Sequence, residues 1–267
     1  MRIHVLALNN AFDTGLAAVL DAFCTANLLA EMADNPSLHF EVKLVGLHRK
    51  ITTARGLSVA VMPAARARTP DAVVMPALLH MKPESLVQAL AGSEVRDACA
   101  VLRKWSERGA LTATACVGTF VLAESALLDG EEATTTWWLA PLFRQRYPRV
   151  RLDESRILVH SNAVVTAGAA LSHLDLALAL IRRASPELAD ITARYPPRHL
   201  RIPPHSPGPA GKLLNLDIGT VYGPVPTLCP CYLCSGYDSG LPWLCVRARG
   251  TSPELGVRIC GRSSDAG

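Results

Sequence analysis

The chain has few aromatic and few charged residues, and no long hydrophobic run that is free of polar side chains. Aromatic side chains make up 5% of the 267 residues and charged ones 19%. The formal net charge of +4 is too small to demand a nucleic-acid partner. The longest apolar region, 163–181, is interrupted by His173 and Asp175, so we expect no membrane span.

Cysteine is also sparse in the first 195 residues, and no cleavable signal segment is evident at the start. Cys24, Cys99 and Cys116 are far apart in this stretch, which is typical of reduced thiols in a cytoplasmic protein. We therefore expect a cytoplasmic chain without a metal site or cofactor.

Short apolar runs alternate with helical patterns through residues 1–195. This alternation predicts βαβ units and a mostly parallel sheet with helices. The expected strands are 3–8, 40–47, 71–75 and 111–115, with hairpins formed by 51–53 and 57–62 and by 157–160 and 164–165. The expected helices are 16–32, 84–90, 95–108, a helix from the Cys116 turn to about 127, 139–147, 169–183 and 186–194.

The most informative segment is 112–123, where a small-residue strand ends at Cys116 and a helical pattern follows directly. A side chain on such a strand-to-helix turn projects at the carboxyl end of the sheet, as in a nucleophile elbow. The adjacent helix N-terminus is expected to lower the pKa of the Cys116 thiol. The alternative is a buried cysteine that packs as a small hydrophobic residue.

The sequence changes character after Tyr195, where we place a domain boundary. Residues 196–267 hold 11 of the 19 prolines, 10 of the 18 glycines and 5 of the 8 cysteines, and hydrophobic periodicity vanishes. The cysteine spacing, with a single C-x-x-C pair at Cys231 and Cys234, is poor for a zinc site. One interpretation of this tail is a disordered extension.

Several motifs in residues 1–195 occur together in the order of a known superfamily. They lie at 115–124, 127–130, 133–135, 143–148, 165–168 and 174–178. On these motifs the chain resembles the ThiJ/PfpI superfamily, similar in fold to class I glutamine amidotransferases. Its closest resemblance is to the sensing domain of GlxA-type regulators of the AraC family. The resemblance covers about three quarters of the chain.

The resemblance implies a flavodoxin-like, doubly wound sheet with helices on both faces, a homodimer, and a small-molecule pocket around Cys116. Regulators of this kind continue into helix-turn-helix motifs that bind DNA. We interpret 196–267 instead as a frameshifted or truncated replacement of such a domain, so we expect no DNA binding by this chain. Helix-turn-helix patterning in another reading frame after codon 195 would support this interpretation.

Two positions depart from the enzymes that the chain resembles. Thr136 in Ala133-Thr-Thr-Thr136-Trp-Trp138 stands where such enzymes carry a histidine, and threonine cannot accept a proton near neutral pH. Ala77 in Pro76-Ala77-Leu78 replaces a glycine whose amide faces the oxyanion. These departures favour binding over catalysis.

Other candidate site residues follow from position along the chain. His80 lies just beyond the Ala77 loop, at the carboxyl edge of the sheet where ligands bind in open α/β folds. Asp13 begins the first helix, near the place where relatives put an acidic partner for the cysteine. The simpler interpretation of Asp13 is a carboxylate that the dipole at the helix N-terminus stabilises. For both His80 and His173 we favour an ordinary surface or satisfied interior histidine. We expect Trp137 and Trp138 to be core residues rather than a pocket wall.

Our main hypothesis is therefore a ligand-sensing, dimerising domain of an AraC-type regulator. Its predicted ligand-binding residues are Cys116, Val117, Ala77, Thr136, Asp13 and His80. The alternative is a cysteine hydrolase or hydratase of a small amide, isonitrile or aldehyde-like substrate, with Cys116 as nucleophile and the amides of Val117 and Ala77 as oxyanion donors. A redox sensor at Cys116 ranks last, because no resolving cysteine lies near it in sequence.

Overall fold

The structure is a computed structural model that describes residues 1–33 and 38–194. The boundary predicted at Tyr195, the interpretation of the tail 196–267 and its cysteines all lie outside the described residues. They stay predictions.

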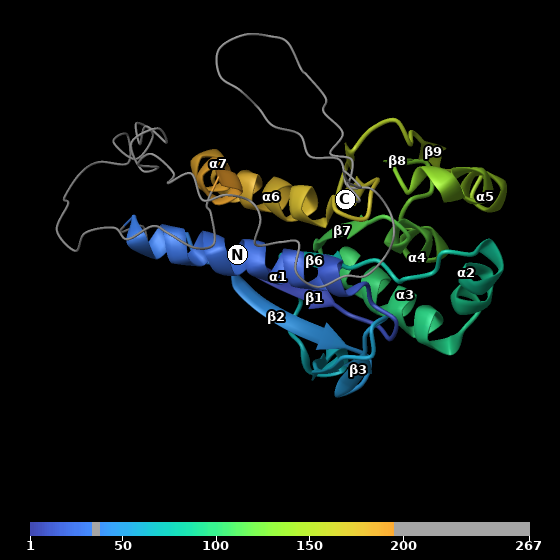
Figure 1. The fold of residues 1–267 in the computed structure, drawn as a ribbon, viewed down its shortest axis with the longest axis horizontal. Coiled ribbons are helices and arrows are strands. Elements are labelled where there is room, and N and C mark those ends of the chain that lie inside the picture. The colour runs from blue at the N-terminus through green and yellow to red at the C-terminus, as the bar shows by residue number, and fades with distance from the viewer. Residues whose placement is uncertain (34–37, 195–267) are drawn as a thin grey trace, which may run out of the picture. The chain divides into compact units, whose positions relative to one another are not determined.

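A seven-stranded sheet forms the centre of the described residues (Figure 1), and all its neighbouring strands are parallel except β10 and β11. Its strand order is β10-β11-β7-β6-β1-β2-β5. The strands are β1 (Arg2–Leu6), β2 (Glu41–Gly46), β5 (Met62–Pro63), β6 (Ala72–Met75), β7 (Leu111–Ala115), β10 (Leu158–Ser161) and β11 (Val164–Ala167). This topology confirms the predicted mostly parallel, doubly wound sheet.

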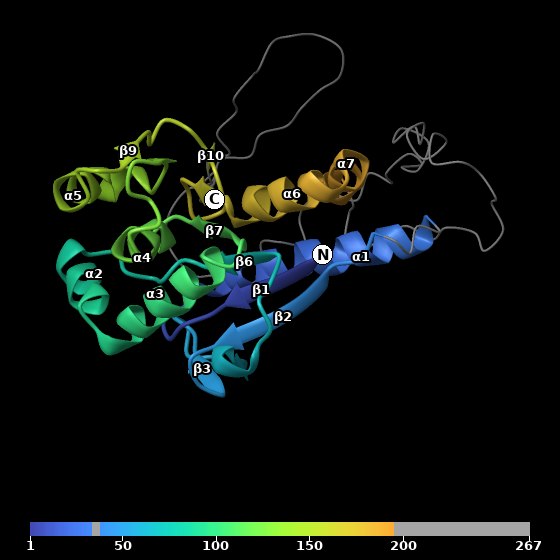
Figure 2. The ribbon, with the colours of Figure 1, turned by 180° about the vertical axis from the view of Figure 1, so that it is seen from behind.

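Helices cover both faces of the sheet, as Figures 1 and 2 show from opposite sides. One layer is formed by α1 (Asp13–Met32), α6 (His173–Ala184) and α7 (Pro186–Arg194), which pack on one another. The other layer is formed by α2 (Pro83–Leu90), α3 (Ser93–Ser106) and α4 (Gly118–Glu124). The remaining elements are α5 (Ala140–Arg146), the 3₁₀ turns η1 (Ala64–Arg66) and η2 (Trp137–Leu139), the hairpin β3 (Lys50–Thr52) and β4 (Ser58–Ala60), and the pair β8 (Glu132–Ala133) and β9 (Arg151–Leu152).

Most predicted elements are confirmed, and the bounds of β7 and α7 are as predicted. The helix expected from residue 169 begins instead at His173, because the Ser172 side chain closes a turn by accepting a hydrogen bond from the Ala169 amide at 2.9 Å. The parallel pair β8 and β9 was not predicted, since two-residue strands leave no periodic pattern to detect.

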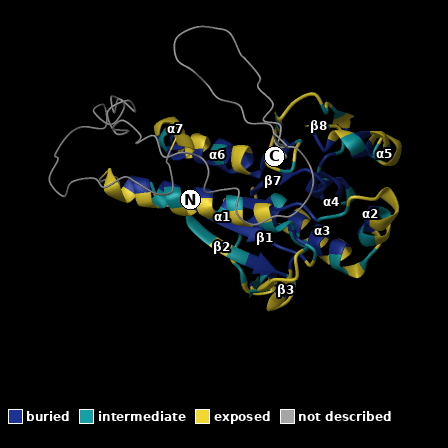
Figure 3. Ribbon diagram, viewed as in Figure 1, coloured by how far each residue is buried: buried dark blue, intermediate teal, exposed yellow. Residues whose placement is uncertain are grey.

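The core lies between the sheet and the two helical layers, where Figure 3 shows the strands mostly buried. Every residue of β6 and β7 is buried. By length and composition alone, α1 is apolar enough to cross a membrane. Val19 and Phe23 are buried on the face of α1 that packs in the core and against α6 and α7, whereas Leu28 and Met32 are exposed.

Candidate functional site

Cys116 occupies the predicted turn between β7 and α4. Its φ of 54° lies in the left-handed region, which costs a residue other than glycine about 1–3 kcal/mol. Two hydrogen bonds maintain the bend: the Cys116 amide donates to the carbonyl of Ala167 at 2.7 Å, and the Cys116 carbonyl accepts from Thr135 Oγ1 at 2.8 Å. The predicted elbow geometry is therefore present.

Gly118 is required for this turn to pack against the sheet. A Cβ at position 118 would lie 2.1 Å from Thr114 Oγ1 and 3.3 Å from the carbonyl oxygen of Met75. Because Thr114 Oγ1 itself donates to that carbonyl at 2.8 Å, it cannot move aside freely. The missing side chain thus lets α4 start directly above β6 and β7.

The expectation of a lowered thiol pKa is wrong. Cys116 is only 4% exposed, and this burial raises the pKa of its thiol because water no longer solvates the thiolate. The Val117 amide and the Thr136 hydroxyl act in the opposite direction but do not offset the burial. The thiol is therefore protonated at neutral pH.

Thr136 is fully buried at the position where the resembling enzymes carry a histidine. Its hydroxyl lowers the pKa of the Cys116 thiol, against the larger effect of burial. Within residues 1–33 and 38–194, Thr136 Oγ1 has no hydrogen-bond partner. A buried hydroxyl without a partner is unusual and costs stability.

The amide of Ala77, which was expected to serve as an oxyanion donor, is hydrogen-bonded to His173. The Ala77 amide donates to His173 Nε2 at 3.0 Å, and His173 Nδ1 then carries the proton and donates to the Ala170 carbonyl at 2.6 Å. Burial lowers the pKa of His173, so the ring stays neutral. Its predicted role as a satisfied interior histidine is confirmed.

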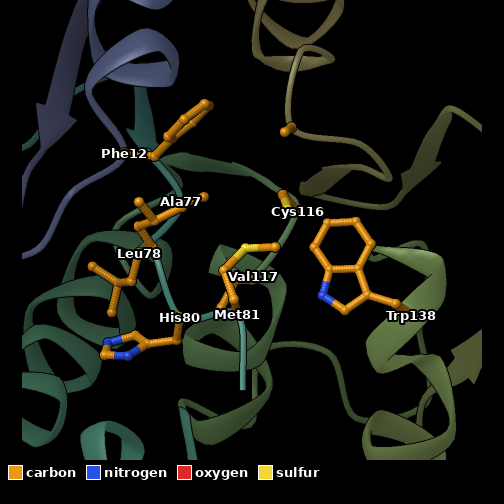
Figure 4. Close-up of a pocket in the computed structure, with 10 residues that line it drawn as sticks. Phe12, Ala77, Leu78, His80, Met81, Cys116, Val117 and Trp138 are labelled. Atoms are coloured by element: carbon orange, nitrogen blue, oxygen red, sulfur yellow. The ribbon is translucent and has the colours of Figure 1, made fainter. Parts of the chain in front are cut away.

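His80 lines the pocket beside Cys116, but its ring is turned away from the sulfur (Figure 4). Its Nε2 accepts from Asn10 Nδ2 at 3.2 Å, and its Nδ1 donates to Ser85 Oγ at 2.8 Å. Burial lowers the pKa of His80 as well. Neither histidine is placed to take a proton from Cys116.

Asp13 lies apart from the predicted constellation. Its carboxylate accepts hydrogen bonds from Thr53 Oγ1 at 2.5 Å and from the Arg55 amide at 3.1 Å. Neither Asp13 nor Thr136 is among the residues that line the pocket. Asp13 therefore ties the start of α1 to the β3–β4 hairpin, which agrees with its simpler reading as a helix N-terminal carboxylate.

A small pocket lies beside Cys116, between the loop that follows β6, the elbow and the start of η2 (Figure 4). Its volume is about 40 Å³. The lining residues are Phe12, Ala77, Leu78, Leu79, His80, Met81, Cys116, Val117, Trp138 and Ala170.

The structure thus brings together four of the six predicted ligand-binding residues: Cys116, Val117, Ala77 and His80. It also corrects the expectation for the two tryptophans, because Trp138 lines the pocket and Trp137 is 74% exposed. Sequence reasoning missed the other lining residues, which carry no chemical motif. Only Leu78 and Leu79 could have been indicated, by their position directly after Ala77.

In the described part of the chain, no group of three or more His, Cys, Asp or Glu side chains could hold a metal ion. Four closely spaced arginines lie on the surface and are at least partly exposed. They form surface ion pairs with nearby carboxylates: Arg144 with Glu154, Arg146 with Glu124, Arg149 with Asp129, and Arg151 with Glu132.

Similarity to known proteins is clear in structure and limited in sequence. No protein-family model matches the chain. Over 89 residues it is 35% identical to the HTH-type transcriptional regulator CdhR of Pseudomonas aeruginosa, a match covering 33% of this chain and 26% of that protein. The chain thus matches about a quarter of the length of this curated relative.

Three solved structures illustrate the structural similarity. An AraC family transcriptional regulator from Pseudomonas putida superimposes with a TM-score of 0.56 at 18% identity, over 72% of this chain and 97% of that one. Oxidized DJ-1 of Toxoplasma gondii gives 0.55 at 21% identity, over 72% and 96%. A ThiJ/PfpI domain protein from Brachyspira murdochii gives 0.53 at 14% identity, over 69% and 96%. The described residues therefore have the doubly wound α/β fold of the DJ-1/ThiJ/PfpI proteins, which the AraC family regulator from Pseudomonas putida shares.

Proposed function

We propose that the described domain is the ligand-sensing domain of an AraC-type transcriptional regulator and that it performs no cysteine catalysis. The observation that carries this proposal is the state of Cys116: a buried thiol with a raised pKa and no free imidazole beside it in the described residues.

Cysteine catalysis needs a thiolate, a proton acceptor and donors for an oxyanion. Burial works against the thiolate at Cys116. His80 and His173 each use both ring nitrogens in other hydrogen bonds. The Ala77 amide, the expected second oxyanion donor, already donates to His173. Burial therefore disfavours the thiolate, and hydrogen bonds to other groups engage the imidazoles and the Ala77 amide.

The pocket and the comparisons support a binding role instead. A concave, mostly apolar site at the carboxyl edge of a parallel sheet is the usual place for a small ligand in open α/β folds. The curated relative is described as an HTH-type transcriptional regulator, and one solved structure with this fold is an AraC family regulator. Ligand binding would then shift the population between two states of the regulator.

Alkylation of the full chain with iodoacetamide across pH 6–11 tests the absence of catalysis. Peptide mass spectrometry separates the relevant thiols, because tryptic peptides 3–43, 97–103 and 109–144 carry Cys24, Cys99 and Cys116 one by one. Exposed Cys24 is the reactive reference, and buried Cys99, whose pKa burial raises to about 11, is the unreactive one. We expect the Cys116 rate to rise with a midpoint above the ordinary thiol value of about 8.5.

The competing function is a cysteine hydrolase or hydratase, and the left-handed backbone at Cys116 is the observation in its favour. A Cys116 midpoint well below 8.5, together with amide or aldehyde turnover that is lost in Cys116→Ser, would establish the enzyme and refute our proposal. The low-pKa redox sensor would show the same low midpoint, but with oxidation of Cys116 by dilute peroxide and no turnover.

The homodimer and the lack of sequence-specific DNA affinity are part of the same proposal. Large apolar side chains that are mostly exposed, such as Leu171 at 73%, are compatible with a subunit interface. Light scattering on the purified full chain should give twice the monomer mass of 28.6 kDa. Binding of the chain to a promoter fragment should be weak and lost at physiological salt, and tight salt-resistant binding would contradict the proposal.

A further inference from the structure

Two unpartnered hydrogen-bond groups belong to η2 and to the residue before it, and one of them is on a residue that lines the pocket. Trp138 Nε1 and Thr136 Oγ1 are both buried, and neither has a hydrogen-bond partner among the described residues. Trp138 lines the pocket, and its indole nitrogen lies on the side of the ring that faces Val117 and Met81 (Figure 4). An indole N–H can only donate, so it calls for an acceptor that this part of the chain does not supply.

The rest of the lining is apolar and carries no formal charge. Phe12, Leu78, Val117 and Ala170 contribute hydrocarbon surface. His80 is neutral because burial lowers its pKa and because both its nitrogens are engaged in hydrogen bonds. A charged group in such a site would lose its hydration without gaining a partner of opposite charge.

The charged residues that flank the lining are not part of it. Asp13 follows Phe12 in the chain, but its carboxylate is bound by Thr53 and the Arg55 amide. Lys82 follows Met81 and is exposed at the start of α2. Neither side chain therefore supplies a counter-charge to the pocket.

Met81 lies on the side of the pocket that the indole nitrogen faces (Figure 4). Its side chain lines the pocket and is 63% exposed, so it is the wall with the most freedom to move. Methionine is unbranched and changes rotamer at low cost. A ligand can therefore take the place of the Met81 side chain beside Trp138 without disturbing the sheet.

We propose that the pocket beside Cys116 accepts a small, uncharged and largely apolar molecule whose hydrogen-bond acceptor pairs with Trp138 Nε1. This inference rests on the proposed sensing function and specifies the class of ligand. The pocket volume of about 40 Å³ limits the group that enters to a few heavy atoms.

Four probes with the same carbon skeleton test the class: butyramide, butyrate, butylammonium and 4-aminobutyrate. Calorimetry on the full chain gives the affinity of each. Protection of Cys116 from alkylation, read on peptide 109–144, shows whether the probe occupies this pocket. We expect butyramide to bind and protect Cys116, and each charged probe to bind at least tenfold more weakly.

Trp138→Phe tests the hydrogen bond, because it keeps an aromatic wall and removes the N–H. We expect it to weaken butyramide about tenfold. Trp137→Phe is the matched control, since Trp137 is the neighbouring indole, is 74% exposed and does not line the pocket. It should leave the affinity unchanged. Thermal unfolding of both variants verifies that they are folded, and equal weakening by both would overturn the role of Trp138.

Failure of the inference and failure of the proposed function are distinguishable. A charged probe that binds as tightly as butyramide and protects Cys116 would overturn the ligand class and leave a sensing pocket. Protection by none of the four probes would overturn this inference, while the alkylation profile of Cys116 still decides on catalysis. Release of ammonia from butyramide that is lost in Cys116→Ser would overturn the proposed function itself.

Discussion

The amide of Ala77 donates a hydrogen bond to Nε2 of His173, which lies 96 residues further along the chain. This 3.0 Å contact joins the loop after β6 to the start of α6. It has two consequences: the loop amide is removed from the pocket as a donor, and the imidazole is held neutral away from Cys116.

We predict that His173→Phe destabilises the domain by about 2–4 kcal/mol, because it leaves the buried Ala77 amide and the Ala170 carbonyl without partners. Urea unfolding followed by circular dichroism measures the change. His48→Phe, at an exposed position, is the control and should change stability by less than about 0.5 kcal/mol. Equal effects of the two variants would show that the His173 contacts are energetically unimportant.

Gly15 provides a second test of the same junction. In an unconstrained helix, Gly→Ala stabilises by about 1 kcal/mol. A Cβ at Gly15 would instead lie 2.7 Å from His173 Nε2, on a ring that is fixed by hydrogen bonds at both nitrogens. We therefore predict that Gly15→Ala destabilises the domain.

A double-mutant cycle identifies the cause of the Gly15 effect. In a His173→Ala background the clash is absent, so Gly15→Ala should become neutral or stabilising. Measuring the free energies of unfolding of the four proteins completes the cycle. Additive changes would mean that the strain arises somewhere other than the His173 ring.

His4 should make the domain sensitive to acid. It is fully buried on β1 against Trp105, with ring centroids 5.3 Å apart, and neither nitrogen has a partner in the described residues. Burial, and then the positive charges of Lys43 and Arg2, lower the pKa of His4 from 6.5 to about 4. In the unfolded chain His4 therefore binds a proton below about pH 6.5, whereas in the folded chain it is protonated only below about pH 4.

Stability should consequently fall as the pH decreases from 6.5 to 4, by up to about 3 kcal/mol from this residue. His4→Leu removes both the proton site and the unpartnered nitrogens. We expect it to raise the free energy of unfolding, and to do so more at pH 5 than at pH 7.5. A gain that is the same at both pH values would contradict the assigned role of His4 ionisation.

Thr136→Val removes the buried hydroxyl that favours the Cys116 thiolate. The thiol pKa should rise further, so the alkylation rate of Cys116 at pH 8.5 should fall several-fold. Stability should hold or increase, because Thr136 Oγ1 has no hydrogen bond to lose within the described residues.

Thr135→Val is the matched comparison for Thr136→Val. Thr135 Oγ1 donates to the Cys116 carbonyl at 2.8 Å, so this variant should lose about 1 kcal/mol of stability. If the two valine variants behave alike in alkylation and in unfolding, the hydroxyl of Thr136 does not act on the sulfur.

The architecture was largely predictable because it depends on local patterns. Strand 111–115, the turn at Cys116 and helix 186–194 each follow from hydrophobic periodicity and from residues close in sequence. The start of α6 was predicted a few residues early, since the Ser172 turn depends on one side-chain contact rather than on periodicity.

The sequence by itself determined the doubly wound sheet and the place of Cys116 at the end of a strand, because hydrophobic periodicity and turn chemistry act over a few residues. Only the tertiary structure decided the proton affinity of Cys116 and the hydrogen bonding of the groups around it. The raised pKa of Cys116 depends on burial by several elements, and the pairing of Ala77 with His173 joins loops far apart in the chain. Solvation and long-range hydrogen bonds set proton affinity, and both exist only once the chain has folded.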